Sequence, residues 1–187
     1  MNELLWYVSR GTGVAAIVLL TAVVVLGAVI AGRRAPRGEG ATLVMALHRS
    51  LSLGMTVFLA AHVATAVAET YVSIDAVSAV LPFTSGYETL WVGLGTLALD
   101  VLVAVVVTSV LRARLAERTW RRVHLLAHAL WPMAVVHGLA LGTGDQPVLR
   151  GTTLACAVAG AAALAWRLAS SHADRDRRAL VAAQEWS

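Results

Sequence analysis

The fold is decided by an apolar stretch that carries two histidines, Leu43–Ala68, with the sequence LVMALHRSLSLGMTVFLAAHVATAVA. This stretch exceeds the roughly 20 apolar residues that a helix needs to cross the hydrocarbon core of a bilayer. His48 and His62 lie within it. An ionisable side chain inside a membrane is costly and usually has a function. The stretch therefore predicts a membrane-spanning helix with a functional pair of histidines.

A second apolar segment, Trp120–Leu141, repeats the pattern with His124 and His137. Further segments of spanning length are expected at Leu4–Ala31, Leu90–Leu111 and Val148–Leu168. Of the 187 residues, 58% are hydrophobic and 14% are charged, whereas a soluble domain carries about 25% charged residues. We therefore predict an all-α integral membrane bundle with five transmembrane helices. The net charge of +4 does not indicate a nucleic-acid partner, because the arginines lie at the ends of the apolar segments.

The distribution of arginine predicts how the bundle is oriented. Arginines gather in the first and third connections and in the tail, and they avoid the second connection, which carries acidic residues instead. They are Arg33, Arg34 and Arg37, then Arg112, Arg114, Arg118, Arg121 and Arg122, and finally Arg175, Arg177 and Arg178. Basic connections stay in the cytoplasm. We therefore expect a multi-pass protein of the cell membrane, with the N-terminus outside and the C-terminus inside.

Two parts of the chain are not expected to span the membrane. Residues 71–88 are too short in apolar sequence and are expected to form a loop with an interfacial turn or helix. Residues 1–170 would form the bundle, and residues 171–187 a solvated or interfacial helical tail on the cytoplasmic side.

The spacing of the histidines predicts how they pair. His48 and His62 are fourteen residues apart, and His124 and His137 are thirteen apart. At about 1.5 Å per residue these steps are about 21 and 20 Å. Since the two helices begin on the same side of the membrane, they run parallel, and the histidines match in depth across helices. We therefore expect an inner pair, His48 and His124, and an outer pair, His62 and His137, each able to hold one b-type haem by its iron.

The facing of the outer histidines depends on a distortion. At about 100° per residue, fourteen residues leave His48 and His62 about 40° apart, whereas thirteen leave His124 and His137 about 140° apart. Pro132 lies between the latter two, and proline kinks helices. We expect a distortion near Pro132 to correct the facing.

Several other interpretations stay open. His128 lies four residues after His124, on nearly the same face, and is the alternative ligand. In place of haem ligation, the four histidines would form polar contacts between helices or a proton relay. Met133 and Cys156 can ligate iron in principle, but packing is their simpler role.

Haem propionates need cations. Arg49, Arg121 and Arg122 are placed for an inner haem, and Arg10 for an outer one. The simpler interpretation of these arginines is that they anchor the helices to lipid headgroups.

The chain resembles the ferric reductase-like transmembrane superfamily, which includes NADPH oxidases, ferric reductases and the haem-binding subunit of bacterial methionine sulfoxide reductase systems. The resemblance rests on LWYVSRGTG at Leu4–Gly13, on HR at His48–Arg49 with His62, and on WRRVHLLAH at Trp120–His128 with His137. It implies that His48 and His124 ligate an inner haem b and His62 and His137 an outer one. Some bacterial members hold fewer haems, so the number expected here is two or one.

The resemblance implies transmembrane electron transfer by an oxidoreductase subunit in the cell membrane of a bacterium. The sequence contains no GxGxxG dinucleotide motif, so we expect no flavin on this chain and a separate flavoprotein reductase or quinol as donor. The acceptor would be ferric iron, oxygen, or a periplasmic or extracellular protein. The rival functions are a quinol-linked cytochrome subunit and a non-haem protein, either a proton-coupled transporter or a structural partner.

Overall fold

A computed structural model describes residues 2–30, 36–70, 72, 74–142 and 146–185 of the chain. Its regular elements are all helical within this part. They are α1 (Asn2–Ile30), α2 (Glu39–Ala68), α3 (Thr89–Val110), the 3₁₀ turn η1 (Arg112–Arg114), α4 (Glu117–Leu125), α5 (Ala127–Leu141) and α6 (Pro147–Glu185). Five stretches are long and apolar enough to cross a membrane, with α4 and α5 together forming the fourth. The prediction of an all-α bundle with five spans is confirmed.

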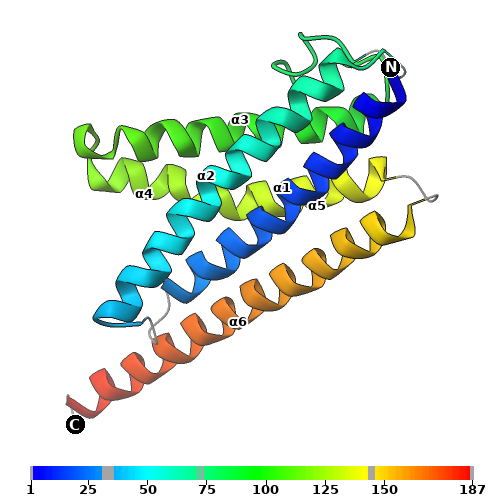
Figure 1. The fold of residues 1–187 in the computed structure, drawn as a ribbon. Helices are drawn as coiled ribbons and strands as arrows, with labels where there is room; N and C mark the ends of the chain where they lie inside the picture. Colours follow the sequence, from blue (N-terminus) through cyan, green and yellow to red (C-terminus); the bar gives the residue numbers. More distant parts are fainter. Residues whose placement is uncertain (1, 31–35, 71, 73, 143–145, 186–187) are drawn as a thin grey trace.

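α1 lies between α2 and α6 (Figure 1). α1 packs along α2 on one side and α6 on another, while α3 packs against α5. The core residues come from all five spans: Ile17, Leu20, Val24, Met55, Ala98, Leu102, Leu130, Trp131, Val135 and Cys156. α1 is the central element, because it also contacts α5.

A buried hydrogen bond ties the fourth span to the first. The indole N–H of Trp131 donates to Thr21 Oγ1 at 3.0 Å, and Trp131 is 5% exposed. Its ring lies against Gly160 of α6, where a Cβ would collide with the indole. Trp131 therefore joins α1, α5 and α6 while its single polar atom is satisfied, as a buried donor requires.

The fourth span is interrupted at Leu126, six residues before Pro132. Leu126 N–H bonds to the Val123 oxygen at 2.9 Å, and Ala129 N–H to the Leu126 oxygen at 2.9 Å. Such bonds to the third residue back wind the chain at about 120° per residue instead of about 100°. The extra rotation reduces the angle between His124 and His137 around the span. The expected distortion thus lies at Leu126, and Pro132 sits inside the uninterrupted α5.

The segment before α3 forms turns instead of a helix. Val80 N–H and Leu81 N–H bond to the Val77 oxygen at 3.0 and 2.7 Å. Ser78 N–H donates to Asp75 Oδ1 at 2.8 Å, and this bond and that of the Ser78 side chain hold the pKa of Asp75 below its ordinary value. Thr96 Oγ1 donates to the Ser78 oxygen at 2.7 Å. The segment therefore forms a turn, and the Thr96 hydrogen bond holds this turn against α3.

The last helix continues well past the predicted span. α6 runs to Glu185, so the backbone of most of the tail is helical, as expected.

Candidate functional site: two pairs of histidines

The inner pair joins the second and fourth spans near one end. His48 lies on α2 and His124 on α4, and their ring centroids are 6.5 Å apart with an interplanar angle of 58°. Both side chains are partly buried. This is the pairing expected from depth.

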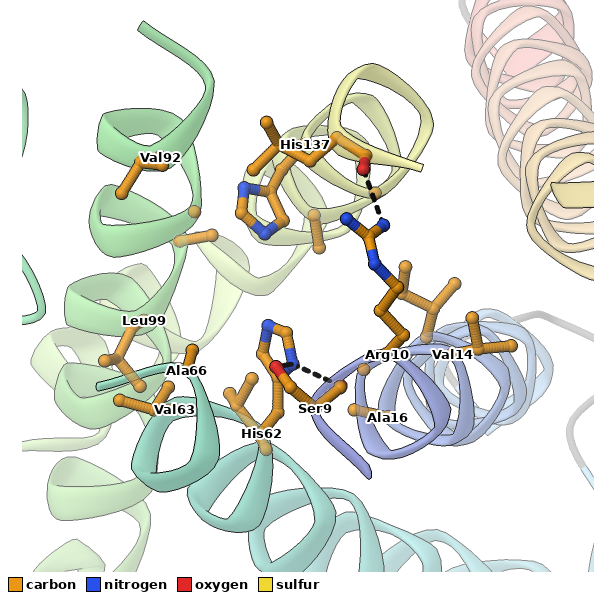
Figure 2. Close-up of a pocket in the computed structure, with 18 of the residues that line it drawn as sticks. Ser9, Arg10, Val14, Ala16, His62, Val63, Ala66, Val92, Leu99 and His137 are labelled. Carbon is orange, nitrogen blue, oxygen red and sulfur yellow. Dashed lines mark hydrogen bonds between the residues drawn. The ribbon is translucent and has the colours of Figure 1, made fainter. Parts of the chain in front are cut away.

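The outer pair joins the same two spans farther along. His62 on α2 and His137 on α5 have ring centroids 6.3 Å apart and an interplanar angle of 80°. Figure 2 shows the two rings facing each other across open space. Since His48 meets His124 and His62 meets His137, α2 and the α4–α5 span run parallel, as predicted.

The separation of the rings suits a metal between them. An imidazole nitrogen lies about 2 Å from a transition metal and about 1 Å from the centre of its own ring, so two imidazoles on opposite sides of one metal have centroids about 6 Å apart. Both pairs have this separation. Rings in edge-to-face contact also reach this separation, so the spacing is compatible with two imidazoles on one metal.

The number of ligands also suits haem better than a bare ion. Among the described residues, no group of three or more histidine, cysteine, aspartate or glutamate side chains could hold a metal ion. Each pair offers two imidazoles, and a porphyrin supplies the four remaining nitrogens of a six-coordinate iron. The residues present therefore fit a bis-histidine haem.

Backbone carbonyls fix the outer rings. His62 Nδ1 lies 2.7 Å from the Ser9 oxygen of α1, and His137 Nδ1 lies 2.8 Å from the Trp91 oxygen of α3. Because a carbonyl oxygen can only accept, each Nδ1 carries the proton, and each Nε2 keeps its lone pair. Metal-ligating histidines typically donate their other N–H in this way.

Glycines leave room for the outer rings. A Cβ at Gly95 would lie 2.5 Å from the His137 ring, and one at Gly13 would lie 2.9 Å from His62 Nδ1. Real Cβ atoms do not approach that closely, so any side chain at these positions would displace the imidazoles. Gly13 belongs to α1 and Gly95 to α3, the same helices that supply the carbonyls.

The inner rings have no such anchors among the described residues. The Nδ1 atoms of His48 and His124 are buried and make no hydrogen bond. The Val23 backbone of α1 lies beside the His48 ring, so the orientation of His124 is the less constrained of the two. The two pairs are alike in spacing and different in how their rings are held.

A cavity of about 230 Å³ surrounds the outer pair. Its walls are mainly apolar (Figure 2), and polar side chains gather among them. These are Arg10, Glu69, Tyr87, Gln146 and Arg150. An apolar cavity with a few polar groups is the usual form of a cofactor site.

Arg10 projects into this cavity. Its guanidinium donates to the Leu141 oxygen at 2.7 Å and lies 4.5 Å from the centroid of the Trp6 ring. Its Nε is buried without a hydrogen-bond partner in the described part of the chain. Arg10 can therefore offer a further donor to an anionic group beside the outer pair.

The other predicted site residues are exposed. Arg49 and Arg122 are exposed, and Arg121 forms an exposed ion pair with Glu117 at 2.6 Å. His128 is exposed, and its Nδ1 lies 3.1 Å from the Leu125 oxygen. The ring contact of His48 is with His124, which makes His124 the better ligand of the two.

Met133 and Cys156 are packing residues in this structure. Cys156 belongs to the buried core, and Met133 packs against that core.

Several residues of the site were not predicted. Ser9 and Trp91 act through backbone oxygens, which every residue has, so the sequence carries no signal for them. Glu69 is 4% exposed in the cavity wall. A glutamate is rarely buried to this extent unless it is paired, and its burial cannot be inferred from the sequence.

Comparison with family models gives a match over most of the chain. The family model described as the ferric reductase like transmembrane component matches residues 12–140, which include all four paired histidines. No curated protein and no solved structure gives a significant match.

Proposed function

Because the chain belongs to the ferric reductase-like transmembrane family, we propose that it is a b-type cytochrome that carries electrons across the cell membrane. The donor is on the cytoplasmic side, and the acceptor is on the outer side. One observation carries the proposal: two pairs of imidazoles at two depths, each with the separation expected of axial ligands.

The chain's own residues have distinct tasks in this function. His48 and His124 would hold the inner haem, and His62 and His137 the outer haem. Haem supplies a one-electron couple when bound, and the axial ligands, hydrogen bonds and low dielectric around it set the potential. The Ser9 and Trp91 oxygens orient the outer imidazoles, and the apolar cavity wall excludes water. Arg10 presents its guanidinium to the propionates of the outer haem.

The partners follow from the predicted orientation. A flavoprotein reductase or quinol would deliver electrons at the arginine-rich end, where the inner pair lies. Ferric iron, oxygen or a protein outside the membrane would accept them near the outer cavity. The chain is thus an oxidoreductase component that works with a separate donor.

The experiment is an absorption spectrum of the purified protein, expressed with adequate haem supply, before and after dithionite. The expected result is a Soret band and, after reduction, the sharp α band of a low-spin b-type haem. A protein that folds and purifies without a Soret band contradicts the proposal. That outcome favours a proton relay or polar contacts between helices as the role of the histidines.

A further inference from the structure

The two pairs differ in the contacts that orient their imidazole rings. The outer imidazoles are oriented by backbone oxygens, whereas the buried Nδ1 atoms of His48 and His124 make no hydrogen bond within the described part of the chain. The second torsion of a histidine side chain has a broad energy profile. A ligand ring without a hydrogen bond therefore needs another contact to fix its plane.

Trp120 supplies such a contact to His124. The two rings are stacked, with centroids 5.0 Å apart and an interplanar angle of 24°. They lie four residues apart on α4, which is the spacing at which side chains meet on a helix surface. Rings that stack in this way restrict each other's rotation.

Arg112 holds the indole in turn. Its guanidinium lies 4.2 Å from the centroid of the Trp120 ring, within the range of a cation–π contact. Arg112 belongs to η1, in the connection between α3 and α4. The orientation of His124 is thereby linked to a second element at the arginine-rich end.

We propose that Trp120 is a positioning residue, which fixes the plane of the His124 imidazole at the inner haem by stacking. This inference rests on the proposed function. At the inner site the stack replaces the backbone hydrogen bond that orients each ligand at the outer site. Trp120 itself does not touch the metal position; it acts through His124.

The test compares two substitutions of Trp120 in the full-length, haem-loaded protein. Trp120→Leu keeps apolar bulk and removes the stack, whereas Trp120→Phe keeps an aromatic ring. Trp166→Leu is the matched control, since Trp166 is 45% exposed on α6. The first measurement is electron paramagnetic resonance of the ferric protein, because the g values of low-spin bis-imidazole iron depend on the angle between the ligand planes. The second is the rate of haem loss to apomyoglobin.

We expect Trp120→Leu to change one of two low-spin signals and to accelerate the loss of one haem about 10- to 100-fold, the range seen when the groups that orient metal ligands are removed. Trp120→Phe should restore most of both properties, and Trp166→Leu should match the wild type. Unchanged g values and unchanged haem loss in Trp120→Leu would overturn the positioning role alone. A wild-type protein without haem would contradict the proposed function itself, so the two failures can be told apart.

Discussion

His137 and Trp91 are joined by a hydrogen bond of 2.8 Å between the imidazole Nδ1 and the backbone oxygen. The bond links α5 to α3 and defines the tautomer of His137. His62 has the equivalent bond to Ser9 of α1. α1 and α3 thus orient the two imidazoles that α2 and α5 carry.

These bonds predict that the two haems differ in potential. A histidine that donates its Nδ1–H to a carbonyl is a more basic ligand, and a more basic ligand stabilises ferric over ferrous iron. The two bonds should therefore lower the midpoint potential of the outer haem, whereas the Arg10 cation should raise it. A redox titration followed by absorption should show two components, and His137→Ala should abolish one of them. A single component in the wild type, or two components in His137→Ala, contradicts the assignment.

Gly95 offers a test of the space beside the outer pair. A Cβ there would lie 2.5 Å from the His137 ring, so Gly95→Ala should displace the ligand and lower the haem content from two per chain toward one. Gly151→Ala is the matched control, because no atom lies within 4 Å of its added Cβ. Haem content is measured per mole of purified protein. Full haem content in Gly95→Ala would show that the cavity adapts and that the glycine is not required.

Arg10 should tune the outer haem. A cation near an iron favours the ferrous form, which carries less positive charge, so Arg10→Gln should lower the potential of the outer haem and leave the inner one unchanged. Arg37→Gln, an exposed arginine between α1 and α2, is the control. Redox titration of the wild type, Arg10→Gln and Arg37→Gln gives the midpoint potentials of both haems in each protein. An outer component that stays in place would remove Arg10 from the haem site.

The Trp131–Thr21 bond should contribute to stability without affecting the cofactor. Thr21→Val is nearly the same size, leaves the buried indole N–H without an acceptor and should cost about 1–3 kcal/mol. Thr21→Ser keeps the hydroxyl and is the control. Thermal unfolding in detergent gives the order of the three proteins. A Thr21→Val variant as stable as the wild type would show that the indole finds another acceptor.

The sequence was sufficient for the spans and the pairing because both depend on simple lengths. The third span was expected at Leu90–Leu111 and is found at Thr89–Val110. The pairing follows from the rise per residue, since fourteen and thirteen residues carry both helices to similar depth. His124 was preferred to His128 by the same argument, and its ring contact with His48 agrees with that preference.

The details of the site could not be derived in this way. The break at Leu126 depends on the tertiary packing of the fourth span. The distortion was predicted near Pro132, six residues later, where α5 is continuous. The ring anchors are backbone oxygens of Ser9 and Trp91, whose relevance depends on which residues α1 and α3 bring beside the imidazoles. Gly13 and Gly95 could not be recognised as site residues either, because the sequence does not show which side chain lies beside a glycine.

The most direct measurement is the haem content per chain by pyridine haemochrome assay, in the wild type and in four single variants. The wild type should hold two haems b. His124→Ala and His137→Ala should each hold one, and they should lose different spectral components. His128→Ala should keep two, as should the control Gly151→Ala. One haem in the wild type, or loss of a haem in His128→Ala with retention of both in His124→Ala, would contradict two bis-histidine sites formed by His48 with His124 and His62 with His137.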